Sequence, residues 1–82
     1  MKGHDMTNEL QNILESALTW YEASMREFTF MQKAEAENDK YMTNVYWATC
    51  QEYSGKSDGL LLAYATITGR TLYPWQIKDE LK

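Results

Sequence analysis

The chain has 82 residues, one cysteine, one histidine and a formal net charge of −4. This length provides for one domain with one small core, which gives only marginal stability without a disulfide, a metal or a partner. A single cysteine excludes an internal disulfide. One cysteine and one histidine also exclude a zinc site made from three or four nitrogen and sulfur ligands of the chain. Close helix packing or oligomerisation therefore remains as the source of additional stability.

The charge and hydropathy patterns narrow the class of partner. The acidic balance argues against direct nucleic-acid binding, because phosphates are neutralised by clusters of Lys and Arg. No apolar run approaches the ~20 residues of a membrane span. The first ten residues, MKGHDMTNEL, lack the apolar segment of a signal peptide. We therefore expect a cytoplasmic protein without a cofactor, with residues 1–6 flexible and with either Met1 or Met6 as the natural start.

The first long helix is predicted to begin at a cap on Asp5 or Thr7. No glycine or proline occurs between Gly3 and Gly55, which favours helix. Apolar residues recur every three or four positions on one stripe. That stripe comprises Leu10, Ile13, Leu14, Ala17, Leu18, Tyr21, Met25 and Phe28. Asn38 and Asp39 are typical capping residues, so we expect a tight turn near 37–40, with one continuous helix through 36–41 as the alternative.

A second long helix is predicted to end at Gly69, a residue that readily adopts the left-handed conformation of a helix end. Its stripe comprises Met42, Val45, Tyr46, Thr49, Cys50, Tyr53, Leu60, Ala63, Tyr64 and Ile67. Pro74 suits the first turn of a short third helix, which we expect to fold back through Leu72, Trp75, Ile77 and Leu81. The sequence thus predicts a single all-α domain over 1–82: an antiparallel hairpin of two long helices plus a short C-terminal helix.

Apolar residues also occur off the two stripes. On a helical wheel, Phe30 points away from the stripe of the first helix, and Trp47, Leu61, Leu62 and Ala65 point away from that of the second. A helix that is apolar on more than one side is usually covered on more than one side. We therefore expect a homodimer with a four-helix-type bundle in preference to a monomer.

The stretch YSGKSDGLLLAYATITGRTLYPW, residues 53–75, contains a GKS triplet without a phosphate-binding loop. Such a loop needs a glycine five positions before the glycine of GK, and that position is Cys50. Gly55, Gly59 and Ala63 instead recur every four residues as a ridge of small side chains. Such a ridge lets another helix approach closely, so we expect Gly59→Leu to block helix packing and lower the melting temperature.

The candidate partner-binding residues are aromatic, aliphatic or acidic. Tyr and Trp are enriched at interface hot spots, and residues 5–39 carry a net charge of −6, which favours a basic partner. The candidates are Phe30, Trp47, Leu61, Leu62, Tyr73, Trp75, Glu15 and Glu22. We interpret the acidic group Glu35, Glu37 and Asp39 as a solvated helix end, and Cys50 as a buried, unreactive thiol.

The stretch from Val45 to Trp75, with GKSDGLLLAYATITGR at its centre, resembles small helical proteins of unknown function that phages and mobile elements of Gram-positive bacteria encode. In those proteins a long helix rich in Ala and Tyr carries a G-K-x-x-G-like segment and ends at a T-G-R-like cap. The resemblance implies no catalytic residues. It implies a phage-type accessory protein of the kind that blocks a host protein, as anti-CRISPR and other host-takeover inhibitors do.

Three hypotheses about function follow. The first is a non-enzymatic protein–protein interaction module that blocks a host protein stoichiometrically. The second is a homo-oligomeric structural or assembly subunit without inhibitory activity. The third, a small enzyme that binds a metal or a small molecule, is disfavoured because no catalytic motif is present, and it would need a polar pocket with converging titratable groups.

Overall fold

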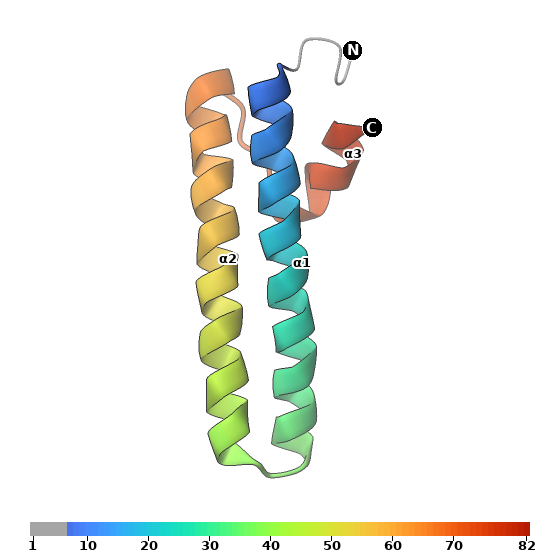
Figure 1. The fold of residues 1–82 in the computed structure, drawn as a ribbon, viewed down its shortest axis with the longest axis vertical. Coiled ribbons are helices and arrows are strands. Elements are labelled where there is room, and N and C mark those ends of the chain that lie inside the picture. Colours follow the sequence, from blue (N-terminus) through green and yellow to red (C-terminus); the bar gives the residue numbers. More distant parts are fainter. Residues whose placement is uncertain (1–6) are drawn as a thin grey trace.

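A computed structural model of the chain describes residues 7–82. The helix α1 spans Asn8–Ala36, α2 spans Lys40–Thr68, a 3₁₀ turn η1 spans Pro74–Gln76, and α3 spans Ile77–Leu81. The two long helices lie antiparallel, and the C-terminal segment folds back beside the first half of α1 (Figure 1). The predicted all-α hairpin with a short third helix is confirmed. The predictions about residues 1–6, including the cap at Asp5 and the start at Met6, lie outside the described residues.

The helix ends follow the predicted capping chemistry. At the start of α1, the Thr7 hydroxyl accepts a hydrogen bond from the Leu10 N–H at 3.2 Å. The chain turns through Glu37–Asp39, where Asn38 has a φ of 60° and the Asp39 carboxylate accepts from the Met42 N–H at 3.1 Å. The predicted turn is therefore confirmed over the continuous helix.

The end of α2 also matches its prediction. Gly69 adopts a φ of 73° and donates its N–H to the Ala65 carbonyl at 2.8 Å. Pro74 occupies the first turn of η1, where its missing N–H costs no helical hydrogen bond. The chain reverses between these two residues, and this reversal returns α3 to the hairpin.

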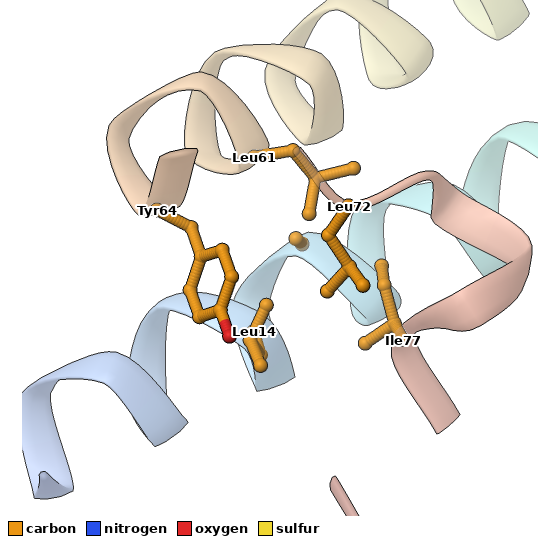
Figure 2. Close-up of a cluster of buried hydrophobic side chains, with 6 residues drawn as sticks. Leu14, Leu61, Tyr64, Leu72 and Ile77 are labelled. Carbon is orange, nitrogen blue, oxygen red and sulfur yellow. The ribbon is translucent and has the colours of Figure 1, made fainter. Parts of the chain in front are cut away.

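The core lies in the half of the hairpin away from the turn. It comprises Leu14, Ala17, Leu61, Tyr64, Leu72 and Ile77, contributed by both long helices and the C-terminal segment (Figure 2). Leu61 was expected to point away from the packed face, and this expectation is wrong. Only 6% of Leu61 is exposed, because it packs in the cluster that Leu14 of α1 and Leu72 of the returning segment complete.

The half of the hairpin near the turn has no third layer in the described part of the chain. Between residues 24 and 53 only Ser24 and Ala34 are buried. Met25 and Val45, both predicted to lie on packing stripes, are substantially exposed, as is Ile67 near the end of α2. One helix–helix contact is narrower than the apolar stripes of these helices, so the margins of the stripes remain uncovered.

Candidate protein-docking surfaces

The first candidate surface is an aromatic pair on the C-terminal segment. The rings of Tyr73 and Trp75 stack with their centroids 5.0 Å apart and their planes 3° from parallel. Gln76 fixes this turn, because its side-chain carbonyl accepts from the Tyr73 N–H at 2.9 Å and its own N–H donates to the Tyr73 carbonyl at 2.8 Å. Trp75 is 68% exposed, so the expectation that it packs into the core is wrong. The pair instead presents a rigid aromatic surface to solvent.

A groove of about 260 Å³ runs beside this pair, between α2 and the returning segment. It is lined by Asp58, Leu61, Leu62, Ala65, Thr71, Leu72, Tyr73 and Pro74. Most of this lining is apolar, and Asp58 is its one charged residue. The volume falls below the roughly 300–1,000 Å³ of small-molecule pockets. The groove is therefore suited to an anchoring side chain of another protein, with a cation or a hydrogen-bond donor beside it to meet Asp58.

A buried carboxylate holds the segment that forms this groove. Glu80 is 4% exposed, and its oxygens accept two hydrogen bonds from the Arg70 guanidinium, at 2.9 and 3.3 Å. The Tyr64 hydroxyl donates to the same carboxylate at 3.3 Å. Burial and the nearby Glu80 charge raise the pKa of Tyr64 above its ordinary value. The contact links α2 to both ends of the C-terminal segment, so the groove is preformed.

The second candidate surface lies on the other side of the hairpin. Trp20 of α1 and Tyr53 of α2 have ring centroids 5.3 Å apart, and the Lys56 ammonium lies 4.3 Å from the centre of the Trp20 ring. Two residues along a helix amount to a rotation of about 200° around its axis, so the two side chains point to nearly opposite sides. Lys56 therefore faces away from Asp58 of the groove.

We call this second surface the open face and define it by Trp20, Glu27, Phe30, Tyr46, Tyr53 and Lys56. Phe30 and Tyr46 pair on it near the turn, with ring centroids 5.5 Å apart, and Phe30 is 47% exposed. Ile13, Met31, Leu60 and Ile67 follow the same three- and four-residue spacing. The C-terminal segment covers the other side of the hairpin and leaves this face uncovered.

The predicted ridge of small residues does not pack within the chain. Gly55, Gly59 and Ala63 are all exposed on the outer side of α2. A methyl group added at Gly55 or Gly59 would meet nothing within 4 Å. The expectation that Gly59→Leu disrupts helix packing therefore fails for the contact between α1 and α2. Any close approach along the ridge requires a second molecule.

The other predicted partner-binding residues are distributed over several surfaces. Trp47 is 44% exposed and contacts Phe28 across the hairpin, at a centroid distance of 6.4 Å. Leu62 is 68% exposed at the groove. Glu15 is exposed on α1, whereas Glu22 forms an ion pair with Lys78 of α3 at 3.4 Å. The structure thus brings together Leu62, Tyr73 and Trp75, and separates them from Phe30, Trp47 and Glu15.

Three further observations bear on other functions. Within residues 7–82, no three His, Cys, Asp or Glu side chains are grouped as metal ligands would be. Cys50 is only partly buried, so the expectation of a buried thiol is wrong in part. This partial burial, and to a smaller degree the Glu27 charge, raise the pKa of the Cys50 thiol. No described helix combines the length and the apolar character that crossing a bilayer requires.

Comparison of the chain with protein-family models, with curated proteins and with solved structures gives no match. The two surfaces therefore carry the functional inference.

Proposed function

We propose that this protein is a non-enzymatic protein–protein interaction module that binds its partner through the groove and the Tyr73–Trp75 pair. The observation that carries the proposal is the rigid, exposed aromatic stack at the edge of a preformed apolar groove. Large aromatic side chains contribute most at interfaces when they are already held in place, because little conformational entropy is then lost on binding.

The chemistry of the groove specifies the binding segment of the partner. An aliphatic or aromatic side chain would enter between Leu62 and Leu72, and an adjacent Arg or Lys would approach Asp58. The same cation is attracted to the exposed face of the aromatic stack, and the net charge of −4 favours the encounter with a basic surface. The resemblance to phage-encoded proteins suggests that this partner is a host protein, blocked one to one by steric cover of its surface.

The test uses the full chain and peptides of defined chemistry. One peptide set carries a single Leu, Phe or Trp flanked by Arg, and a matched set carries the same residue flanked by Glu. We expect the basic set to shift the amide signals of Leu62, Tyr73 and Trp75 in a ¹H–¹⁵N NMR titration, and the acidic set to shift none of them.

Two substitutions separate the groove from the rest of the surface. Leu62→Asp is expected to abolish the shifts, whereas Trp47→Ala, which changes an exposed aromatic elsewhere on the hairpin, is expected to preserve them. Equal responses to both peptide sets, or shifts confined to the open face, would overturn the assignment of the groove.

A second function, that of a homo-oligomeric structural or assembly subunit, is supported by a different observation. The open face carries aromatic side chains from both long helices, and these are half-buried or exposed in a single chain. We propose that it mediates homodimerisation into a four-helix-type bundle. The groove is on the opposite side, so dimerisation and partner binding are compatible.

A further inference from the structure

The groove of the proposed function has two walls of different kinds. One wall belongs to the long helix α2, whereas the other is formed by residues 71–74 of the C-terminal segment, residues 70–82. We infer that this segment opens and closes as one unit, that the groove exists only in the closed state, and that Glu80 is the positioning residue for closure. This inference deepens the proposed function and rests on it.

The C-terminal segment is attached to the hairpin over a short length. Leu72 and Ile77 are the residues that it contributes to the buried core. Its helix α3 has only five residues, too few for a helix to persist without tertiary contacts. The helices α1 and α2 have 29 residues each and pack against each other. A small unit at a chain end is therefore expected to open at a lower free energy than the whole fold.

Glu80 ties the two ends of this segment together. Its carboxylate accepts two hydrogen bonds from the guanidinium of Arg70, ten residues earlier in the chain. It also accepts from the hydroxyl of Tyr64 on α2. The groove wall at residues 71–74 and the buried Ile77 both lie inside the loop that the ion pair closes. The contacts of one carboxylate therefore fix this wall against α2.

The burial of Glu80 makes its partners decisive for the closed state. The Glu80 side chain is 6% exposed, whereas that of Arg70 is 61% exposed. Within residues 7–82, Arg70 and Tyr64 supply the side-chain groups that donate to this carboxylate. A carboxylate that stays buried after losing its cation costs more free energy than one that returns to water. Because α3 lies at the chain end, loss of Arg70 should shift the segment toward the open state.

Closure of the segment and binding of the partner are then coupled. A peptide that binds only the closed state stabilises that state by mass action. At about 100 times its dissociation constant, such a peptide reduces the open population about 100-fold. The groove lining ends at Pro74 and includes no residue of α3. Slower opening of α3 in the presence of the peptide would therefore be transmitted through the segment.

Amide hydrogen exchange of the unmodified full chain provides the first test. The reporter is the N–H of Ile77, which donates to the Pro74 carbonyl and belongs to a completely buried residue outside the groove lining. Peptides with one apolar residue flanked by Arg should slow its exchange by up to about 100-fold near saturation. The matched peptides flanked by Glu should leave it unchanged. The N–H of Thr43, which donates to the Asp39 carbonyl beside the turn, is the internal control and should not respond.

Three variants test the role of Glu80 in the absence of peptide. Arg70→Leu leaves the carboxylate buried without its cation and should speed the exchange of Ile77 by roughly tenfold or more. The double variant Arg70→Leu/Glu80→Gln should recover most of the protection, because Gln is neutral and its amide oxygen can still accept from Tyr64. Lys82→Leu is the matched control, since it removes one positive charge from an exposed position of the same segment and should change nothing.

Each result decides one step. If no peptide shifts the signals of the groove, the proposed function fails, and this inference fails with it. Peptide binding that leaves the exchange of Ile77 unchanged overturns the coupling while the proposed function stands. Exchange of Arg70→Leu at the unmodified rate, or a double variant no better protected than Arg70→Leu alone, overturns the role of Glu80. The peptide test uses the unmodified chain, so it decides the coupling even where a variant does not fold.

Discussion

Ile77 holds the C-terminal segment on the hairpin, and its truncation tests this part of the fold most directly. The side chain is completely buried, against Leu14 of α1 and Leu72 of the same segment. Replacing a buried Ile by Ala costs about 2–5 kcal/mol, from lost transfer free energy and from the cavity left behind. A domain of this length is expected to have a free energy of unfolding of roughly 4–12 kcal/mol. Ile77→Ala should therefore remove about a third of it.

Unfolding by urea and unfolding by heat are each monitored by far-UV circular dichroism. With a loss of about 3 kcal/mol, the melting temperature should fall by roughly 12–24 °C. The helix α3 has only five residues and cannot persist without this contact. Its release should also lower the urea dependence of the unfolding free energy, because less surface is then buried in the native state.

Trp75→Ala is the matched control, two residues earlier in the same segment. Trp75 is the larger side chain, but it is 68% exposed. Its removal should change the free energy of unfolding by at most about 0.5 kcal/mol. If both substitutions destabilise equally, or if Ile77→Ala costs less than about 1 kcal/mol, the packing described for the C-terminal segment is refuted.

Three further predictions concern ionisation and glycine. The raised pKa of Tyr64 means that the folded state favours the neutral phenol, so stability should be lost as the pH rises above about 10; Tyr64→Phe should reduce this loss in denaturation measured between pH 8 and 11. Cys50 should react more slowly with a thiol reagent at pH 8 in the folded chain than in urea, and equal rates would contradict the raised pKa of this partly buried thiol. Gly59→Ala should stabilise the chain by up to about 1 kcal/mol, because a methyl group at this helical position meets no atom. Gly69→Ala should destabilise it by a similar amount, because the φ of 73° disfavours a side chain; melting temperatures that shift in the same direction would contradict this pair.

The helices and their ends were predictable because their causes are local. A chain segment without glycine or proline, a hydroxyl at Thr7, a carboxylate at Asp39 and a glycine at 69 act within one turn of the backbone. Burial on α2 was less predictable. Leu61 lies off the apolar stripe of its helix and is buried in a cluster to which Leu72, eleven residues later, contributes from the returning segment. Periodicity within one helix does not contain that contact.

Buried polar residues were also missed. Ser57 is 1% exposed and donates its hydroxyl to the Ala17 carbonyl at 2.8 Å, where the helices approach closely. The sequence indicates this burial only through the four-residue spacing that places Ser57 between Tyr53 and Leu61. Glu80 carried no such signal, since its partners Arg70 and Tyr64 come from different elements. The groove likewise depends on the path of the returning segment.

The distribution of buried residues has a kinetic consequence. The turn at Glu37–Asp39 brings nearby residues together at low entropic cost, but the adjacent helical turns bury only Ala34 and so provide little stabilisation. The well-packed contacts join Leu14 to Leu61 and to Ile77, residues far apart in the sequence. Closing the hairpin from its tip therefore gains little until the distant ends meet. We expect folding to be slower than that of other helical hairpins, with a transition state organised around the two chain ends.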